Sequence, residues 1–264
     1  MPELAEVEYY RRQWDAGLGK KVARVEMHPA TRVFREVETR KLATALQGQR
    51  FSGSWTRGKQ MLFRFGKEAW VGVHLGMTGS LRTEALPFTP EKHDHFVLFL
   101  PKVALVFRDA RQFGRVRFDQ GKGEPEWWRK IPASPHENAF TKNVMKAFLA
   151  RHRRLPIKAT LLLQTGFAGI GNWMADEILW QARIHPRRMT EELSEEQVAT
   201  LWRATRSICR KALQTIAPAF GDPPAGWLFH ERWSRQGECP KHGKLLDCAT
   251  VGGRTTLWCS RCQK

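Results

Sequence analysis

The residues whose types and spacing are best suited to chemistry lie at the end of the 264-residue chain. Cys239 and His242 are separated by two residues, sixteen residues follow His242, and Cys259 and Cys262 are again separated by two. Two such pairs of soft ligands around two short strands have the spacing of a zinc ribbon. Because a Cys₃His set suits a tetrahedral zinc ion, we expect these four side chains to bind one Zn²⁺.

Cys248 leaves a second ligand set open, because its thiol is an alternative to His242. It lies six residues beyond the knuckle, in the outgoing strand, whereas His242-Gly243 completes the tight turn, which favours His242. Between the two ligand pairs, Gly252-Gly253 predicts a turn from which Arg254 projects. An arginine on such a tip can reach a phosphate or the minor groove; the alternative is a solvated charge.

The charge of the chain indicates a polyanionic partner. Its 44 Lys and Arg against 26 Asp and Glu give a net charge of +18. Solubility requires a net charge of only about 2–8 in a small domain, so we expect the partner to be nucleic acid. The first residues are acidic, unlike a secretory signal, and no apolar run reaches the roughly 18 residues of a membrane span.

Two segments with different secondary-structure patterns, the first rich in strands and the second helical, must position these residues. A helix over 3–14 is expected first, then strands over 22–27, 50–56, 60–65, 69–75, 95–100, 104–108 and 115–118, with a short helix over 36–46. A turn-rich break over 121–125 follows. The pattern then becomes helical over 141–152, 156–163, 173–182 and 194–216, and Ser194 with Gln197 forms a capping box for the last of these helices.

Four further motifs precede the cysteine hairpin: Pro2-Glu3-Leu4-Ala5-Glu6-Val7-Glu8, Arg57-Gly58-Lys59, His74-Leu75-Gly76-Met77-Thr78-Gly79 and Gly169-Ile170-Gly171-Asn172. With the hairpin, they stand in the order and spacing of the formamidopyrimidine-DNA glycosylase/endonuclease VIII family, which the chain resembles from end to end. Lys92-His93-Asp94-His95 is closer to the formamidopyrimidine-DNA glycosylase branch, whereas Arg57-Gly58-Lys59 is closer to endonuclease VIII.

The resemblance implies an α+β fold in three parts. These are an N-terminal β-sandwich with flanking helices over 1–125, a helix–two-turn–helix DNA-binding domain over 126–220, and a lesion loop with the zinc-ribbon β-hairpin over 221–264. Damaged or abasic double-stranded DNA would lie in the cleft between these parts, and the zinc would be structural. We expect a monomer of the cytoplasm, nucleoid-associated in a bacterium, with no membrane contact.

The resemblance makes Pro2 a nucleophile. Its small side chain permits removal of Met1, and an α-amino group with a pKa of about 7.7–8.0 is partly uncharged at physiological pH. Such an amine attacks C1′, releases the base and forms a Schiff base, after which β- and δ-elimination cut the strand. Glu3 would be the general acid/base and Glu6 a possible proton relay, although both also suit a helix N-terminus. Lys59 would contact the phosphate or the surroundings of the departing base.

Chemistry at C1′ requires the nucleotide to leave the double helix, and side chains must fill the gap. The resemblance assigns this role to Met77, Arg111 and Phe113. Met77 is a flexible apolar side chain that can fill the gap, and Phe113 can insert between base pairs. The guanidinium of Arg111 can donate two hydrogen bonds to the base that has lost its partner. A core position is the alternative for Met77 and Phe113, but the flanking glycines favour exposed turns.

The motif over 169–172 predicts a phosphate site. Its glycines let the backbone approach a phosphate, and the following helix presents free N–H groups. Asn172 would cap that helix and donate to the phosphate, and Lys158 is a further candidate for phosphate contact.

Some positions depart from the family pattern without removing a catalytic group: Ala5 in place of a proline, His242 in place of a cysteine, and Gln112 in place of an arginine. The loop over 219–226 differs from the family's lesion-reading loop. The lesion therefore stays open between oxidised purines, such as 8-oxoguanine and formamidopyrimidines, and oxidised pyrimidines or bulkier adducts. A non-catalytic protein that binds damaged DNA is a third hypothesis.

Overall fold

The computed structural model describes residues 1–28, 31–234 and 237–264. The chain divides into two compact units. The first consists of Met1–Pro2 and Glu6–Ile131, and the second of Glu3–Ala5 and Pro132–Lys264. No helix in the described ranges combines the length and the apolar character needed to cross a bilayer.

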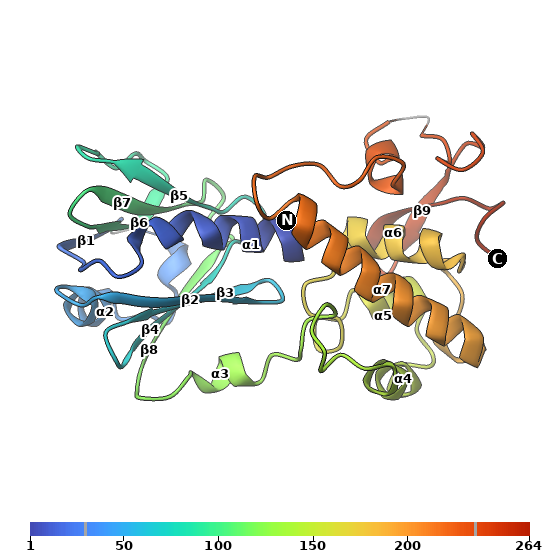
Figure 1. The fold of residues 1–264 in the computed structure, drawn as a ribbon, viewed down its shortest axis with the longest axis horizontal. Helices are drawn as coiled ribbons and strands as arrows, with labels where there is room; N and C mark the ends of the chain where they lie inside the picture. Colours follow the sequence, from blue (N-terminus) through green and yellow to red (C-terminus); the bar gives the residue numbers. More distant parts are fainter. Residues whose placement is uncertain (29–30, 235–236) are drawn as a thin grey trace. The chain divides into compact units, whose positions relative to one another are not determined.

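The first unit is a sandwich of two antiparallel four-stranded sheets (Figure 1). One sheet has the order β1 (Arg24–Met27), β6 (Asp94–Phe99), β7 (Val103–Arg108), β5 (Ser80–Ala85). The other has the order β2 (Phe51–Arg57), β3 (Gln60–Phe65), β4 (Ala69–His74), β8 (Arg115–Gln120). The expected β-sandwich is confirmed, and β5 was not predicted.

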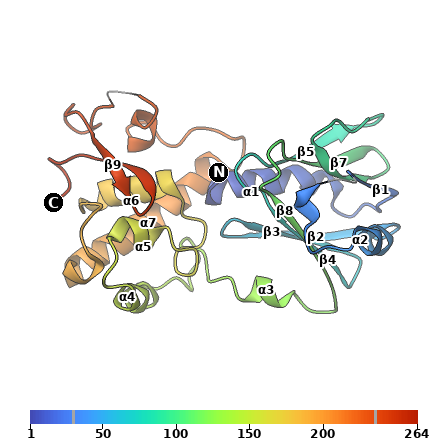
Figure 2. The same cartoon turned by 180° about the vertical axis from the view of Figure 1, so that it is seen from behind.

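Helix α1 (Leu4–Gln13) runs between the two sheets (Figures 1 and 2). Trp14, directly after it, is fully buried, and its ring lies 4.7 Å from Phe63 of β3 and 6.1 Å from Phe96 of β6. This side chain therefore joins both sheets in one core. The unit also contains α2 (Thr39–Leu46), α3 (Glu126–Arg129) and the 3₁₀ turns η1 (Trp14–Gly17) and η2 (Arg32–Phe34).

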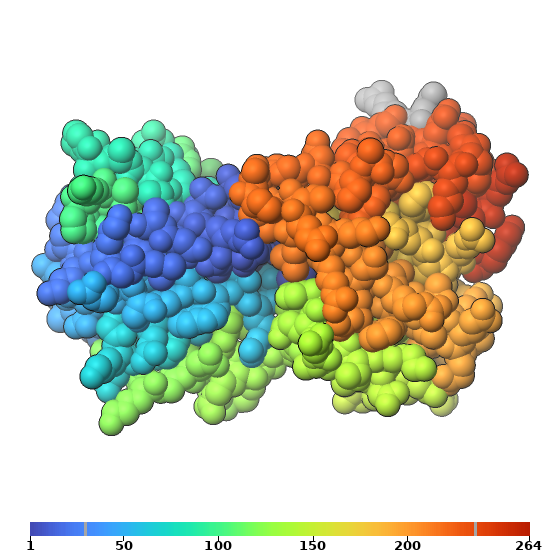
Figure 3. Space-filling view, in the orientation of Figure 1, coloured from blue at the N-terminus to red at the C-terminus, as the bar shows by residue number. Residues whose placement is uncertain are grey.

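The second unit is built on helices: α4 (Lys142–Arg151), α5 (Ile157–Leu161), α6 (Asn172–Ala182) and α7 (Glu195–Thr215), with 3₁₀ turns η3 (Thr190–Glu192) and η4 (Leu228–Glu231). The predicted capping box is confirmed, because Ser194 Oγ accepts from Gln197 N and the Gln197 side chain accepts from Ser194 N. Helix α7 packs on α6 and covers part of it on the face drawn in Figure 3.

A hairpin of β9 (Asp247–Val251) and β10 (Arg254–Trp258) ends the chain, and β10 packs along α6 (Figure 2). Its tip is Gly252-Gly253, with φ angles of 60° and 72°, the left-handed region in which glycine is favoured. The predicted position of the turn is therefore confirmed.

Candidate active site and metal centre

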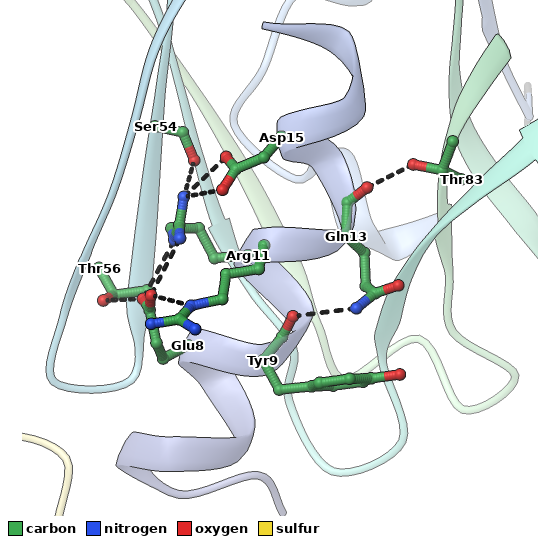
Figure 4. Close-up of polar contacts among 9 residues, drawn as sticks. Glu8, Tyr9, Arg11, Gln13, Asp15, Ser54, Thr56 and Thr83 are labelled. Atoms are coloured by element: carbon green, nitrogen blue, oxygen red, sulfur yellow. Dashed lines mark hydrogen bonds and ion pairs between the residues drawn. The ribbon is translucent and has the colours of Figure 1, made fainter. Parts of the chain in front are cut away.

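A polar clasp holds α1 on strand β2 (Figure 4). Arg11 donates to Glu8 (3.0 Å), to Asp15 (2.7 Å) and to Ser54 Oγ of β2 (2.8 Å), while Thr56 Oγ1 of the same strand donates to Glu8 at 2.7 Å. Burial alone would raise the pKa of Glu8, but the hydrogen bonds from the neighbouring arginines and Thr56 outweigh burial and lower it. The clasp therefore has a charged carboxylate at its centre, and it fixes the helix that follows the N-terminus.

Pro2 lies two residues before the start of α1 and is partly exposed. Met1 in front of it is 49% exposed, so the terminus is accessible to processing. Glu6 lies in the first turn of α1 and is also partly exposed. The order of these residues leaves the nitrogen of Pro2 as the terminal amine once Met1 is removed.

Lys59 occupies the two-residue turn of the β2–β3 hairpin, yet it is only 7% exposed. Gly58 before it has a φ of 59°, as such a turn requires. His74 is the last residue of β4, which pairs with β3. Burial lowers the pKa of His74 to about 4, and the positive charges of Lys59, Arg117 and Arg35 act in the same direction. His74 is therefore neutral at physiological pH.

His74 Nδ1 accepts a hydrogen bond from Gly76 N at 3.1 Å, which leaves the ring proton on Nε2 as a donor. His74 is part of the motif over 74–79, but the sequence alone did not indicate it as a site residue. Its position on β4, beside the β2–β3 hairpin that carries Lys59, indicates that His74 is a candidate site residue.

Met77 and Phe113 are exposed, at 45% and 47%, which excludes the core position for both. Arg111 is also exposed, and its guanidinium lies 4.6 Å from the Phe113 ring centroid. Asp109, fully buried, accepts from Thr78 Oγ1 at 2.7 Å, next to Met77, and from the Gly114 N–H at 2.7 Å, next to Phe113. One carboxylate thus brings together the two loops that carry the three expected insertion residues.

Glu3 is buried at the start of α6, in the second unit. Its carboxylate accepts from the backbone N–H groups of Gly171 (2.9 Å), Trp173 (3.0 Å) and Met174 (3.2 Å). A Cβ on Gly171 would lie 2.2 Å from Glu3 Cδ. Only glycine at position 171 therefore leaves room for the Glu3 carboxylate. Glu3 therefore complements the N-terminus of α6, rather than that of its own helix.

The expectation that Asn172 caps α6 is wrong. The N-cap is Gly171, and the Asn172 side-chain amide donates to Thr255 O of β10 at 2.8 Å. The carboxylate of Glu3 takes the capping role, because it reaches the first free N–H groups of the helix. Asn172 instead joins the first turn of α6 to the hairpin.

Lys158, the further candidate for phosphate contact, does not lie at the surface. It is completely buried, and its ammonium donates to Asn172 O at 2.7 Å and pairs with Asp176, which also pairs with Arg232. Burial lowers the pKa of Lys158, against the opposing effect of Asp176. In this conformation the ammonium faces protein acceptors rather than a phosphate.

Arg254 is exposed at the start of β10, as expected. The hairpin tip beside it is close-packed, since a Cβ on Gly252 would lie 2.8 Å from Ala159 Cβ of α5. Because Asn172 also bonds to Thr255, the tip and the first turn of α6 are adjacent. The structure thus brings Arg254, Asn172 and Glu3 to one end of α6.

The four expected metal ligands lie together, with their ligand atoms within 4.8 Å of one another. Cys239 Sγ is 3.7 Å from Cys262 Sγ, and His242 Nε2 is 3.3 Å from Cys262 Sγ and 3.5 Å from Cys259 Sγ. A tetrahedral ion with bonds of about 2.3 Å to sulfur and about 2.0–2.1 Å to nitrogen needs ligand atoms about 3.5–3.8 Å apart. The cluster fits such an ion. Cys248 is exposed on β9 outside the cluster, which resolves the alternative in favour of His242.

Glu177 on α6 is a buried group that sequence reasoning missed. It accepts from Gln181 Nε2 at 2.7 Å and from Phe229 N at 3.2 Å, just beyond the loop over 219–226. Burial raises its pKa to about 7, although these hydrogen bonds act to lower it. The same loop end packs its aromatic rings on Trp173, with Phe229 at 5.1 Å and Trp227 at 6.4 Å.

Comparison with known proteins agrees with this arrangement. The family model for the formamidopyrimidine-DNA glycosylase N-terminal domain matches residues 1–116, and that for its H2TH domain matches residues 131–220. The formamidopyrimidine-DNA glycosylase of Roseiflexus sp. (strain RS-1) is 34% identical over 275 residues, covering 100% of both chains. That of Pelotomaculum thermopropionicum is 35% identical over 280 residues, covering 100% of this chain and 99% of the relative.

Solved structures give the same result over the whole chain. A complex of Lactococcus lactis Fpg with DNA containing an oxidised pyrimidine has a TM-score of 0.90 at 28% identity, with 100% of both chains covered. A complex of MutM with DNA containing carbocyclic 8-oxo-G has a TM-score of 0.88 at 29% identity, again with 100% coverage. Since the family models match most of the sequence and full-length relatives exceed 30% identity, the chain belongs to the formamidopyrimidine-DNA glycosylase family.

Proposed function

We propose that the protein is a bifunctional DNA glycosylase and AP lyase of base excision repair, which acts on double-stranded DNA that contains a damaged base or an abasic site. The observation that carries the proposal is the Glu3 carboxylate, buried next to Pro2 in the sequence and held by three N–H donors of α6. Substitution at C1′ needs an amine that forms the bond to carbon and a fixed carboxyl group that moves protons.

In the proposed reaction, the Pro2 nitrogen attacks C1′ as the bond from C1′ to the base breaks. The Glu3 carboxylate takes the proton that the Pro2 nitrogen loses and passes it to the ring oxygen, which opens the sugar and leaves an iminium between Pro2 and C1′. Loss of the C2′ proton then expels the 3′ phosphate, and loss of the C4′ proton expels the 5′ phosphate. Glu6, three residues beyond Glu3, is the second proton carrier, and water finally hydrolyses the link to Pro2.

We assign phosphate binding to Lys59, His74, Asn172 and Arg254. Lys59 supplies a positive charge, and the neutral His74 supplies an Nε2–H donor beside it. Arg254 is exposed at the tip of the ribbon, next to the first turn of α6. Lys158 acts indirectly, because its ammonium holds the carbonyl of Asn172.

Met77, Arg111 and Phe113 fill the gap left by the extruded nucleotide in this proposal. Their exposure and the two loops tied by Asp109 support the assignment. Insertion of an apolar wedge unstacks a base step, and the DNA bends where this happens. Arg111, whose guanidinium lies over the Phe113 ring, then reads the unpaired base.

We propose that the metal held by the Cys₃His cluster is a single structural Zn²⁺. Four protein ligands close the tetrahedron, so no position remains open for a substrate or an activated water. The ion would fix the base of the hairpin whose tip carries Arg254. We also assign residues 1–125 to the catalytic sandwich, 126–220 to DNA binding and 221–264 to lesion recognition and the ribbon, in a monomer acting on cytoplasmic, nucleoid DNA.

We propose oxidised purines, such as 8-oxoguanine and formamidopyrimidines, as the substrate class. The full-length relatives bear the name formamidopyrimidine-DNA glycosylase, which supports this choice. Oxidised pyrimidines and bulkier adducts are the second candidate, supported by Lactococcus lactis Fpg structures with an oxidised pyrimidine and with N7-benzyl-Fapy-dG in DNA. Excision from duplexes that each contain one lesion distinguishes the two.

Borohydride reduction tests the central step. Protein whose mass shows loss of Met1 should form a covalent adduct on an abasic duplex when borohydride is added, whereas protein that retains Met1 should not. Glu3→Gln should lose base excision and keep a measurable part of abasic-site cleavage, because an abasic sugar has already lost its base. Absence of an adduct with correctly processed protein would favour the non-catalytic DNA-binding alternative.

A further inference from the structure

The second unit carries a group of cations that the proposed reaction does not use. The end of α4 and the loop that follows it contribute Arg151, Arg153 and Arg154, and the segment after α6 contributes Arg183, Arg187 and Arg188, with Lys264 at the end of the chain. All seven are exposed or partly exposed. We call these seven residues the arginine patch.

Backbone hydrogen bonds hold the two segments of the patch side by side. Ile157 N donates to Arg188 O at 2.8 Å, and Glu191 N donates to Arg153 O at 3.1 Å. At the chain end, His185 N donates to Lys264 O at 3.0 Å. The cations therefore belong to one surface, although up to about 110 residues separate them in the sequence.

Few acids balance this surface. Within the described ranges, Arg153 is the one cation of the patch with a carboxylate partner, Glu191 at 3.4 Å. Arg183 adopts a φ of 59° at the C-cap of α6, a left-handed position at which glycine is usual. One cation complements the C-terminal carbonyls of α6, which accounts for Arg183. Arg151 and Arg187 also lie over the rings of Phe148 and Trp258, and Arg188 and Lys264 donate to backbone oxygens, but none of these contacts is with a side-chain carboxylate.

The patch begins at the end of α6 opposite to Glu3. The helix of 11 residues rises about 15 Å from Asn172 to Ala182. Strand β10 follows the same direction: Thr255 bonds to Asn172 at the catalytic end, whereas Lys264, beyond the metal ligands, bonds to Arg183 at the other end. A strand of DNA that contacts Arg254 and Asn172 thus leaves the cations at the C-terminal end of α6 available.

We propose that the arginine patch is a second DNA-binding site, which holds the phosphates of an undamaged duplex while the catalytic site is occupied. Six of the seven cations are arginines, whose planar forks match phosphate oxygens. Their exposure suits a contact that forms and breaks quickly. Such a site lets the enzyme pass between DNA segments during its search for lesions.

A duplex of about 13 base pairs with an abasic site, reduced with borohydride to fix it at Pro2, tests the proposal because it blocks the catalytic site. The fixed complex should bind a second, labelled undamaged duplex, with a slope of log K against log salt of about −3.6 for four phosphate contacts. Replacing Arg153, Arg154, Arg187 and Arg188 by serine should weaken this second binding at least tenfold. Cleavage of the short abasic duplex should stay within twofold, which also confirms that the variant folds.

A matched variant removes four exposed cations from the first unit, Lys21, Arg40, Lys41 and Lys67, with the same change in net charge. It should retain second-duplex binding within threefold. The proposal is overturned if the fixed complex binds no second duplex, if both variants lose binding equally, or if the patch binds polyglutamate in preference to DNA. Failure to form the covalent complex would count against the proposed function, and binding of two duplexes by free protein would then test the patch separately.

Discussion

The Asp109 carboxylate and the Thr78 hydroxyl, 31 residues apart, share a hydrogen bond of 2.7 Å. The same carboxylate accepts from the backbone of Arg111 (3.3 Å) and Gly114 (2.7 Å). Gly76, with a φ of 63°, brings the first loop against the second, since a Cβ there would lie 2.5 Å from the Phe113 carbonyl carbon. The proposed insertion residues are thus held in place by buried polar contacts rather than by a hydrophobic core.

Thr78→Val should therefore impair insertion while leaving the reacting groups intact. The change removes one donor to a buried carboxylate, at a cost of about 1–3 kcal/mol. We expect single-turnover excision from a duplex to fall about tenfold, which corresponds to about 1.4 kcal/mol in the barrier. Thr78→Ser, which retains the hydroxyl, should behave as wild type. An equal loss on an abasic site in single-stranded DNA, which has no partner base to replace, would contradict the insertion role.

Gly171→Ala should displace the Glu3 carboxylate, because the new methyl group would lie 2.2 Å from its carbon. Positioned proton transfer contributes about 10²–10⁴-fold to such reactions, so we expect base excision to fall by at least about 100-fold. Borohydride trapping on an abasic duplex should be affected less, since that sugar has no base to lose. Kinetics on both substrates measure the difference.

Gly123→Ala is the matched control. It lies in an exposed turn, and a Cβ there meets nothing within 4 Å. Excision should stay at the wild-type rate. If Gly171→Ala also retained it, the contacts of Glu3 with the first turn of α6 would be irrelevant to catalysis.

Much of the fold follows from local patterns in the sequence. The strand over 60–65 was predicted with its observed bounds because apolar and aromatic residues fill most of it, and Ser194 was identified as a cap because its partner is three residues away. Strand β5 was missed because it is mostly polar, with Leu81 as its one buried side chain. Helix α2 begins three residues later than expected, since Glu36 has a φ of 69°, which is incompatible with a helix.

The site was less predictable, because its contacts join distant parts of the chain. The acid at Glu3 was identified, but its donors lie 168 to 171 residues away and no local pattern announces them. Lys158 was predicted as a candidate for phosphate contact, since the burial that pairs it with Asp176 depends on packing of α5 against α6 and is not visible in the sequence. The metal ligands were predictable because each pair is separated by two residues, and this local spacing is typical of the tight turns that hold a metal ion.

Removal of the metal should disorder the ribbon and so remove Arg254 from its position. We expect Cys259→Ser to lose one equivalent of zinc by metal analysis, and binding to abasic DNA to weaken with it. Cys248→Ser is the control, because Cys248 is exposed and outside the cluster. Loss of metal in the control, or its retention in Cys259→Ser, would show that the ligand set is different.

Glu177 links pH to stability. Burial raises its pKa from 4.5 to about 7, so the folded protein keeps the proton where the unfolded chain has released it. Its stabilising contribution is complete below about pH 4.5 and is lost as the pH rises through 7, by at most about 3 kcal/mol. His74, with its pKa lowered from 6.5 to about 4, acts in the opposite sense: its contribution is present above pH 6.5 and is lost as the pH falls through 4.

The difference in unfolding free energy between wild type and Glu177→Gln isolates Glu177, because His74 contributes equally to both. Glutamine keeps the shape and the acceptor for the Phe229 N–H but does not titrate. Urea unfolding from pH 5 to pH 8 should show wild type losing stability relative to the variant as the pH rises, with most of the change below pH 7. A difference that is constant over this range would mean that Glu177 titrates near its ordinary value, and that the end of the loop over 219–226 admits water to it.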